Sequence, residues 1–362
     1  MEEKRVYNFA AGPSTMPEEV LREAGAEIMN FRGSGMSVME MSHRSKAFLS
    51  VFEETKDTLR RLMKVPENFE ILFLQGGATM QFAMAPMNFI GRTGKADYAI
   101  TGSFASKAAD EAKKYGDIAI AASSKAKNHT YIPKQEELIL RDDASYFYYC
   151  ANNTIYGTEW QYTPVAPAGV PLVADMSSDI LTRYVDWEKY ALVFAGAQKN
   201  MAPAGVTTVF VNKDYVGSAL PITPVMLDYA AMIKGDSMHN TPPCWCIYMM
   251  GLILKWVEKM GGIEAMEERK RIRSKLLYDV IDASSLYKGC AEKDARSFMN
   301  VTFVTGDAEL DKRFIAGAKE VGIENVNGHR SVGGMRASIY NAMPIEGVKA
   351  LADYMVEFEK RG

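Results

Sequence analysis

Seven short apolar runs recur in the first two thirds of the chain, and they constrain its fold more than any other feature. The segments between them carry helical patterns, such as the stretch at residues 46–63. Apolar runs that alternate with helices are typical of an α/β layered fold. We therefore predict strands of one sheet at residues 71–74, 98–101, 118–122, 146–150, 172–174, 192–195 and 206–211.

The two ends of the chain show different sequence patterns from the part between them. Thr15, Pro17 and Glu18 form a capping-box pattern, which predicts a helix start there. From about residue 245 the pattern changes to long helices at 246–260 and 263–281, followed by a strand–helix–strand–helix series that ends at 345–359. We predict an N-terminal arm (1–15) associated with a small C-terminal domain (258–362), and a large domain (16–257) between them.

Composition excludes several classes of partner. The chain has 362 residues, 48% of them hydrophobic, and a net charge of −3, which gives no general attraction to nucleic acid or anionic lipid. The longest apolar stretch, residues 245–254, is shorter than the roughly 20 residues that a membrane span needs. The four cysteines lack disulfide or zinc spacing, and residues 1–5 precede no signal-peptide core. We expect a cytoplasmic protein without a metal site.

Lys199 and Asp175 are the strongest candidates for chemistry. Lys199 follows the apolar run at 191–194 among small residues, and Asp175 ends the run at 171–174. A lysine in this position can carry an aldehyde cofactor as a Schiff base, and a carboxylate can keep a pyridine nitrogen protonated. Asp175 could instead only cap the turn that follows its strand. Together the two residues indicate pyridoxal phosphate.

A glycine pair supports the same site. Gly76 and Gly77 join an apolar run to a helical pattern, so backbone N–H groups and the Thr79 hydroxyl could bind phosphate there. Alone, such a pair is more often a tight connection. Ligands of open α/β sheets bind beyond the carboxyl ends of strands, however, and Asp175 and Lys199 also follow such ends.

Polar residues gather in three probable loops, at residues 42–44, 239–243 and 328–336. The pairs His43-Arg44 and His329-Arg330 and the nearby Arg336 carry groups suited to gripping a doubly charged small anion. A surface salt bridge is the usual fate of a single arginine. Two His-Arg dipeptides in a chain with only four histidines weaken that simpler interpretation.

These motifs closely resemble the phosphoserine aminotransferase family, which belongs to the class V aminotransferase group of fold-type I pyridoxal-phosphate enzymes. The resemblance covers essentially the whole chain and rests on NFAAGP (8–13), SVMEMSHR (37–44), AGAQKN (195–200), NTPP (240–243) and GHRSVGGMRASIYN (328–341). It implies a large domain with a mostly parallel central sheet flanked by helices, and a smaller α+β C-terminal domain.

The resemblance also implies roles for individual residues. Lys199 would carry the cofactor, Asp175 would pair with its ring nitrogen, and Thr154 would lie near its ring hydroxyl. The phosphate cup would be formed by Ala78, Thr79 and Gln198, and completed across a homodimer interface by Asn240 and Thr241. Arg336 would hold the substrate α-carboxylate. The distal phosphate or carboxylate would be bound, partly by the partner subunit, by His43, Arg44, His329 and Arg330.

Two positions depart from many members of the family. Phe104 stands where tryptophan often stacks on the cofactor ring, and phenylalanine can still stack there with less area. Thr79 stands where some bacterial members carry an arginine that helps to bind the substrate phosphate. Phosphate binding would then depend more on Arg44, His329 and Arg330.

The activity implied by the resemblance is a reversible transamination in L-serine biosynthesis. It would convert 3-phosphohydroxypyruvate and L-glutamate to O-phospho-L-serine and 2-oxoglutarate. Formation of 4-phosphohydroxy-L-threonine for pyridoxine biosynthesis is left open.

An alanine–glyoxylate or serine–pyruvate aminotransferase is the nearest alternative function, although such an enzyme would have no use for the His-Arg cluster. Cysteine desulfurase chemistry is less favoured. It needs a nucleophilic cysteine on a mobile active-site loop, and the residues around Cys290 in the sequence do not suggest one. A non-catalytic metabolite-binding scaffold would not need both Lys199 and Asp175.

Overall fold

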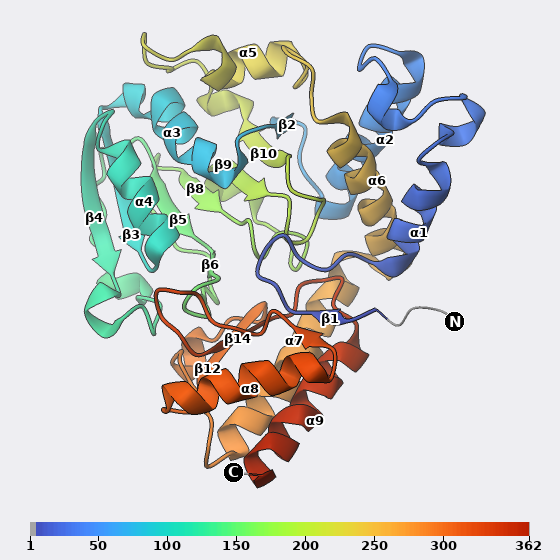
Figure 1. Cartoon of the computed structure of the whole chain (residues 1–362). Coiled ribbons are helices and arrows are strands. Elements are labelled where there is room, and N and C mark those ends of the chain that lie inside the picture. Colours follow the sequence, from blue (N-terminus) through green and yellow to red (C-terminus); the bar gives the residue numbers. More distant parts are fainter. Residues whose placement is uncertain (1–4, 362) are drawn as a thin grey trace.

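The computed structural model describes residues 5–361 (Figure 1). Residues 1–4 of the predicted arm and residue 362 of the predicted C-terminal domain lie outside the described residues. All seven predicted strands are present and form one sheet in the order β2-β10-β9-β8-β5-β3-β4. Their bounds are β2 Phe69–Leu74, β3 Lys95–Ile100, β4 Asp117–Ser123, β5 Phe147–Cys150, β8 Leu172–Asp175, β9 Tyr190–Gly196 and β10 Thr207–Asn212.

The sheet is mostly parallel, as predicted. Only β10 runs against its two neighbours, β2 and β9, while the remaining pairs are parallel. Because β2 and β9 are both antiparallel to β10, they run in the same direction as each other. The carboxyl ends of β2, β8 and β9 therefore meet at one edge of the sheet.

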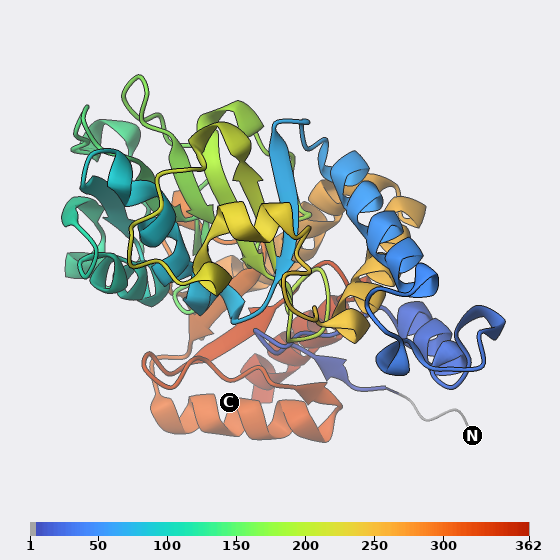
Figure 2. The same cartoon turned by 90° about the horizontal axis from the view of Figure 1, so that it is seen from above.

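Both faces of the sheet are buried except at the edge strand β4, which explains why most of the strands are continuous apolar runs. Successive residues of β2 alternate between two cores: Ile71 and Phe73 belong to one, Leu72 and Leu74 to the other. The first core is covered by α1 Glu18–Glu27, α2 Lys46–Met63 and α6 Cys244–Lys259. The second is covered by α3 Gly77–Phe89, α4 Ser103–Ala112 and α5 Tyr229–Lys234. Figures 1 and 2 both show α2 and α6 side by side.

The helix predictions are confirmed except for one cap. Helix α2 has the predicted bounds and is capped by Ser45, whose hydroxyl accepts a hydrogen bond from the Phe48 N–H at 3.2 Å. Helix α1 begins at Glu18 with Pro17 in the N-cap position and no side-chain cap. The capping box predicted for Thr15 is wrong, because Glu18 occupies the first helical position, whereas a capping box needs it at the third.

The C-terminal residues build a third core below the large sheet (Figure 1). Helix α7 Gly262–Ala283 packs with α8 Ala308–Glu320, α9 Ile345–Arg361 and a small sheet of β11 Lys288–Gly289, β12 Asn300–Val304 and β14 Met335–Ser338. Strand β1 Tyr7–Asn8 pairs with β13 Ile323–Glu324, and Phe9 joins this third core. The division between residues 257 and 258 stays a prediction, since α7 contributes to the first core as well as the third.

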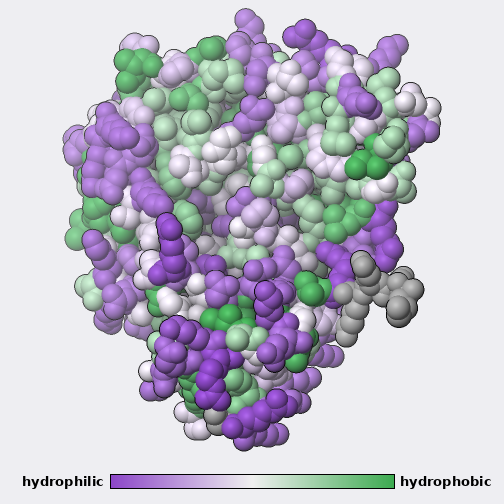
Figure 3. All heavy atoms as spheres, in the orientation of Figure 1, coloured by the Kyte–Doolittle hydropathy of each residue, from purple (hydrophilic) through white to green (hydrophobic). Residues whose placement is uncertain are grey.

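Surface properties vary over the molecule. On the face in Figure 3, hydrophilic residues cover much of the lower part, where α8 and α9 lie. None of the helices within residues 5–361 is long and apolar enough to cross a membrane. The cysteines Cys150, Cys244, Cys246 and Cys290 are free thiols.

Phe314 should contribute strongly to the stability of the third core. Its ring is fully buried, with the rings of Tyr287 and Phe303 at 5.9 and 5.7 Å between centroids. We expect Phe314→Ala to lower the free energy of unfolding by about 3–5 kcal/mol, because it leaves a cavity. Val321→Ala, at a 60% exposed position nearby, should change it by less than about 0.5 kcal/mol. Urea unfolding of both variants measures the difference, and equal effects would contradict this description of the core.

Candidate active site

One cavity of about 350 Å³ lies at the carboxyl edge of the sheet and brings the predicted cofactor residues together. Gly77 after β2, Asp175 at the end of β8 and Lys199 after β9 all line it. It also contains the predicted site residues Ala78, Thr79, Phe104, Thr154, Gln198, His329 and Arg336. A larger hollow of about 470 Å³, between the N-terminal segment and residues 342–344, contains none of the predicted site residues.

Asp175 is buried with one oxygen already occupied. Its Oδ1 accepts hydrogen bonds from the Ser177 N–H at 2.9 Å and the Ser177 hydroxyl at 2.6 Å, which leaves Oδ2 for a donor in the cavity. Burial raises the pKa of Asp175, while Lys199 and the Ser177 hydrogen bonds act in the opposite direction. Asp175 therefore caps a turn and lines the cavity, so the two interpretations of this residue are compatible. In the sequence, the position of Ser177 two residues after an aspartate at a strand end indicates that it can donate hydrogen bonds to Asp175.

Lys199 is held by the N-terminal segment. The Ser14 hydroxyl donates to the Lys199 carbonyl, and the Ser14 N–H donates to the Gln198 carbonyl at 3.0 Å. The Lys199 amine lies 5.8 Å from the centre of the Phe104 ring. Ser14 was missed in the sequence, since a serine far from Lys199 along the chain has no spacing that announces the contact. The lysine and the aromatic ring thus face the same space.

The start of α3 can bind an anion at one end of the cavity. Gly76 and Gly77 have φ angles of 88° and 66°, a left-handed backbone that glycine adopts readily. A side chain at Gly76 would also meet the Met80 Cβ at 2.7 Å. This turn leads into a helix whose first N–H groups, including those of Ala78 and Thr79, have no partner within the helix.

Arg336 provides a cationic group on the opposite side, from β14. One guanidinium nitrogen, Nη1, donates to the Thr154 carbonyl at 3.1 Å. Its Nε is buried without a hydrogen-bond partner among residues 5–361, and burial lowers the pKa of Arg336. A buried donor without a partner is costly, so an acceptor from a bound ligand would stabilise it. This side of the cavity suits a carboxylate.

Five predicted site residues do not line the cavity of this chain: His43, Arg44, Asn240, Thr241 and Arg330. Arg44 and Arg330 are exposed, and the His43 Nε2 is buried without a hydrogen-bond partner among the described residues. Asn240 Nδ2 donates to Gln75 Oε1 at 3.2 Å, which places it just outside the start of α3. That a partner subunit supplies some of these groups stays a prediction.

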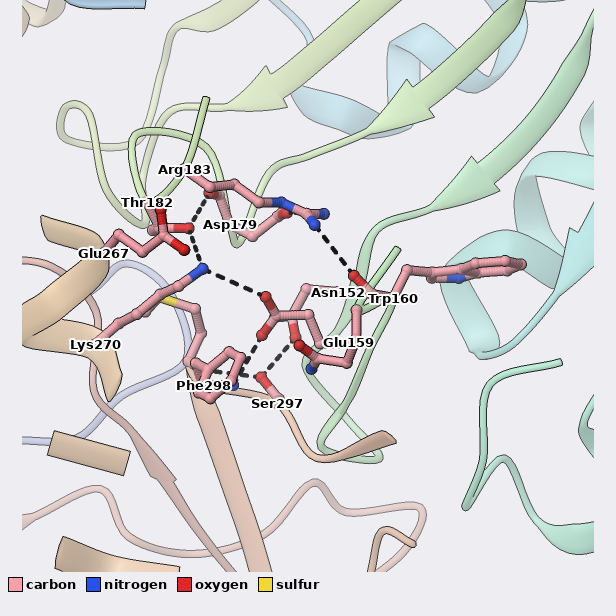
Figure 4. A network of polar contacts seen from close by, with 12 residues as sticks. Asn152, Glu159, Trp160, Asp179, Thr182, Arg183, Glu267, Lys270, Ser297 and Phe298 are labelled. Atoms are coloured by element: carbon pink, nitrogen blue, oxygen red, sulfur yellow. Dashed lines mark hydrogen bonds and ion pairs between the residues drawn. The ribbon is translucent and has the colours of Figure 1, made fainter. Parts of the chain in front are cut away.

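A buried polar network fixes the segment that carries Thr154 (Figure 4). This segment includes β6 Asn152–Asn153 and β7 Thr158–Glu159. The Asn152 side-chain Nδ2 donates to the Ser178 hydroxyl and to Asn300 Oδ1, both at 2.8 Å, and the side-chain Oδ1 accepts from the Ser297 hydroxyl at 2.6 Å. Ser178 follows β8. Ser297 precedes β12, and Asn300 is the first residue of β12. The network therefore ties the large sheet to the C-terminal core.

A buried ion pair continues this network (Figure 4). Lys270 Nζ lies 3.7 Å from Glu159 Oε1 and donates to the Thr182 hydroxyl at 3.2 Å. Glu159 Oε2 accepts from the Phe298 N–H at 2.8 Å. Burial lowers the pKa of Lys270, with Glu159 opposing the shift. These contacts were not predicted, because their members lie far apart in the sequence and match no motif.

Comparison with known proteins places this site in a family. A profile described as "Aminotransferase class-V" matches residues 6–351. Phosphoserine aminotransferases from Lysinibacillus sphaericus and Paraburkholderia phymatum are 49% and 50% identical to the chain over 359 residues, which cover 99% of each chain. A solved phosphoserine aminotransferase from Bacillus circulans subsp. alkalophilus has a TM-score of 0.96 at 46% identity and covers 99% of both chains. A pyridoxal-phosphate-bound one from Trichomonas vaginalis has a TM-score of 0.93 at 40% identity and covers 97% of this chain and 100% of that chain.

The chain belongs to the class-V aminotransferase family and, within it, to the phosphoserine aminotransferases. It is an aminotransferase whose cofactor is pyridoxal phosphate. The described residues fit this cofactor. Asp175 Oδ2 can accept a hydrogen bond from the ring nitrogen, the start of α3 offers N–H donors to a phosphate, and Phe104 lines the same cavity.

Asp175→Asn should separate stability from cofactor binding. Because burial raises the pKa of Asp175, the ionised carboxylate costs stability once the pH exceeds its unfolded pKa, and the full cost is present above its folded pKa. We expect cofactor-free Asp175→Asn to melt at or above the wild-type temperature at pH 8, with a smaller difference at pH 4.5. Pyridoxal phosphate should raise the melting temperature less in the variant, and activity should fall by about 100-fold or more. Asp142→Asn, at an exposed position, is the control. A cofactor-free variant that melts far below wild type would contradict this interpretation.

The Lys270–Glu159 pair should show strong coupling. Lys270→Met leaves a buried carboxylate unpaired, so we expect the free energy of unfolding to fall by about 3–5 kcal/mol. The double variant with Glu159→Gln should recover part of that loss. Lys275→Met, on the exposed face of α7, should cost less than about 1 kcal/mol. A double-mutant cycle in urea measures the coupling, and additive losses would show that the two side chains do not interact.

Proposed function

We propose that this enzyme transfers an amino group between L-glutamate and 3-phosphohydroxypyruvate, giving 2-oxoglutarate and O-phospho-L-serine, in L-serine biosynthesis. The observation that carries the proposal is one cavity that joins a lysine and a buried carboxylate to separate groups for two anions. When bound, pyridoxal phosphate supplies a carbonyl that takes up the amino group and a ring that accepts the electrons left by deprotonation.

Two residues handle protons in this mechanism. Asp175 holds a proton at the ring nitrogen through Oδ2, since Ser177 occupies Oδ1. With the cofactor bound, the Lys199 amine would take the proton from the substrate α-carbon and deliver it to the aldehyde carbon of the cofactor, on the other side of the transferred nitrogen. The Ser14 and Gln198 contacts keep the Lys199 backbone fixed while its side chain moves.

Arg336 and His329 orient the substrate. The Arg336 fork binds the α-carboxylate, with Nη1 held by the Thr154 carbonyl and Nε left without a partner among the described residues. His329 lines the cavity, and Arg330 follows it on the exposed surface of the same loop. These positions support a phosphate of the oxo acid on the His329 side. The phosphorylated oxo acid that leads to 4-phosphohydroxy-L-threonine carries the same two anionic ends and is a candidate second substrate.

Cysteine chemistry is not favoured. Cys290 does not line the cavity, and burial raises its pKa, which keeps it a thiol at neutral pH. Cys150 lines the cavity but is buried, and its pKa is raised as well. If the main substrate were an oxo acid with an uncharged side chain, the cationic groups beside His329 would be left without a partner. We place the reaction in the cytoplasm, where such free thiols persist.

We further propose that the active enzyme is a homodimer. Gln75, Gly76, Gly77 and Thr79 are exposed in the single chain, although they form the phosphate end of the site. The hydrophobic side chains Met80 and Met226 beside them are 38% and 39% exposed. A second copy that covers this edge would bury them and place its own Asn240 and Thr241 against the cofactor phosphate.

Substrate choice tests the proposed function. The wild type should form O-phospho-L-serine from 3-phosphohydroxypyruvate and glutamate, and Lys199→Ala should form none. Arg44→Ala and Arg330→Ala should each lower kcat/KM for 3-phosphohydroxypyruvate by about 10-fold or more, because each removes a charged partner of the phosphate, with a much smaller effect for pyruvate. Arg271→Ala, at an exposed position on α7, is the matched control. Equal losses for both oxo acids would argue against a phosphate site.

A further inference from the structure

Lys107 is a cation beside Phe104, which lines the active-site cavity, and it has no role in the site described so far. It lies one turn after Phe104 on α4, so the two side chains share a helix face. Its Nζ is 5.7 Å from the centre of the Phe104 ring, and Lys199 Nζ is 5.8 Å from the same centre. Lys107 therefore lies beside the ring that the reacting lysine also approaches.

Lys107 has no counter-ion among the residues that the structure describes. The next lysines along the chain differ, because Lys113 lies 2.8 Å from Asp110 and Lys114 lies 2.6 Å from Glu111. A lysine whose only role is to keep the helix surface polar would be stabilised by a similar acidic neighbour. Lys107 is exposed and free to move its flexible stem towards the cavity.

The groups around Lys107 share its charge. Burial lowers the pKa of His329, and the positive charges of Arg336, Arg330 and Lys107 lower it further. These four side chains come from two separate elements, α4 and the segment 329–336, and lie close enough for the three other cations to act on His329. In a chain with a net charge of −3, such a local excess of positive charge is what a dianionic ligand requires.

We propose that Lys107 determines substrate specificity by binding the phosphate group of the phosphorylated oxo acid. This inference rests on the proposed function and adds a residue to it. Arg336 is engaged with the α-carboxylate side, so the second anionic group needs other cations. Lys107 can reach that group from α4, beside Phe104, whereas His329 and Arg330 belong to a separate loop. Its compact ammonium acts as a point charge on a flexible stem, so it can contact a phosphate oxygen without a fixed fork geometry.

The alternative is that Lys107 only packs its stem and charge against Phe104, which would affect all substrates alike. Three variants distinguish the two roles. Lys107→Met keeps an apolar stem without the charge, and Lys107→Arg keeps the charge. Lys113→Met removes a charge from the end of the same helix and serves as the control.

The measured quantity is the ratio of kcat/KM for 3-phosphohydroxypyruvate to that for pyruvate, with glutamate as donor. We expect Lys107→Met to lower this ratio by about 10- to 100-fold and to raise the inhibition constant of inorganic phosphate. Turnover of pyruvate and the melting temperature should stay unchanged. Lys107→Arg should retain most of the preference, and Lys113→Met should retain all of it.

Two outcomes would overturn the role of Lys107 alone. In the first, the wild type prefers the phosphorylated substrate and Lys107→Met keeps that preference. In the second, Lys107→Met lowers both activities by the same factor, which would identify a packing role. A wild type that shows no preference for 3-phosphohydroxypyruvate would instead reject the proposed function, and the inference with it.

Discussion

The common direction of β2, β8 and β9 is the constraint on which the site depends. The antiparallel strand β10 lies between β2 and β9 and still leaves their carboxyl ends at one edge. Gly77, Asp175 and Lys199 therefore meet although about 120 residues separate the first from the last. Reversal of any of these strands would move its residue to the opposite edge, and no local change in sequence could compensate.

The cavity holds two charged groups whose burial is not fully compensated by other residues of the folded protein. Asp175 is a buried carboxylate with a raised pKa, and Arg336 is a partly buried cation with a lowered pKa. In each case desolvation opposes the charge that the chemistry needs. Opposite charges from a cofactor and a substrate would reverse both effects. The same residues that cost stability in the free protein therefore give the bound state its affinity, which is the usual balance in an active site.

Sequence patterns predicted the parts of the molecule that depend on local or periodic features. Most of the strands were recognisable because both of their faces are buried, and Asp175 and Lys199 because they lie at or just after the end of a strand. The Thr15 cap failed because the pattern fixes the residue types but not the position at which the helix begins. Ser14, Lys107 and the Lys270–Glu159 pair could not be found this way, since their contacts depend on how distant segments pack.

The buried network has a role that hydrophobic packing could not fill. Apolar contacts between the large sheet and the C-terminal core are non-directional, so they would tolerate small shifts of one part against the other. Hydrogen bonds from Asn152 to Ser178 and Asn300 tolerate much less, because each needs a defined distance and angle. Thr154 follows Asn152 by two residues, and its carbonyl orients Arg336. A shift of the network would therefore be transmitted to the Arg336 guanidinium, which we propose binds the substrate carboxylate, and this would link the junction of the two cores to substrate orientation.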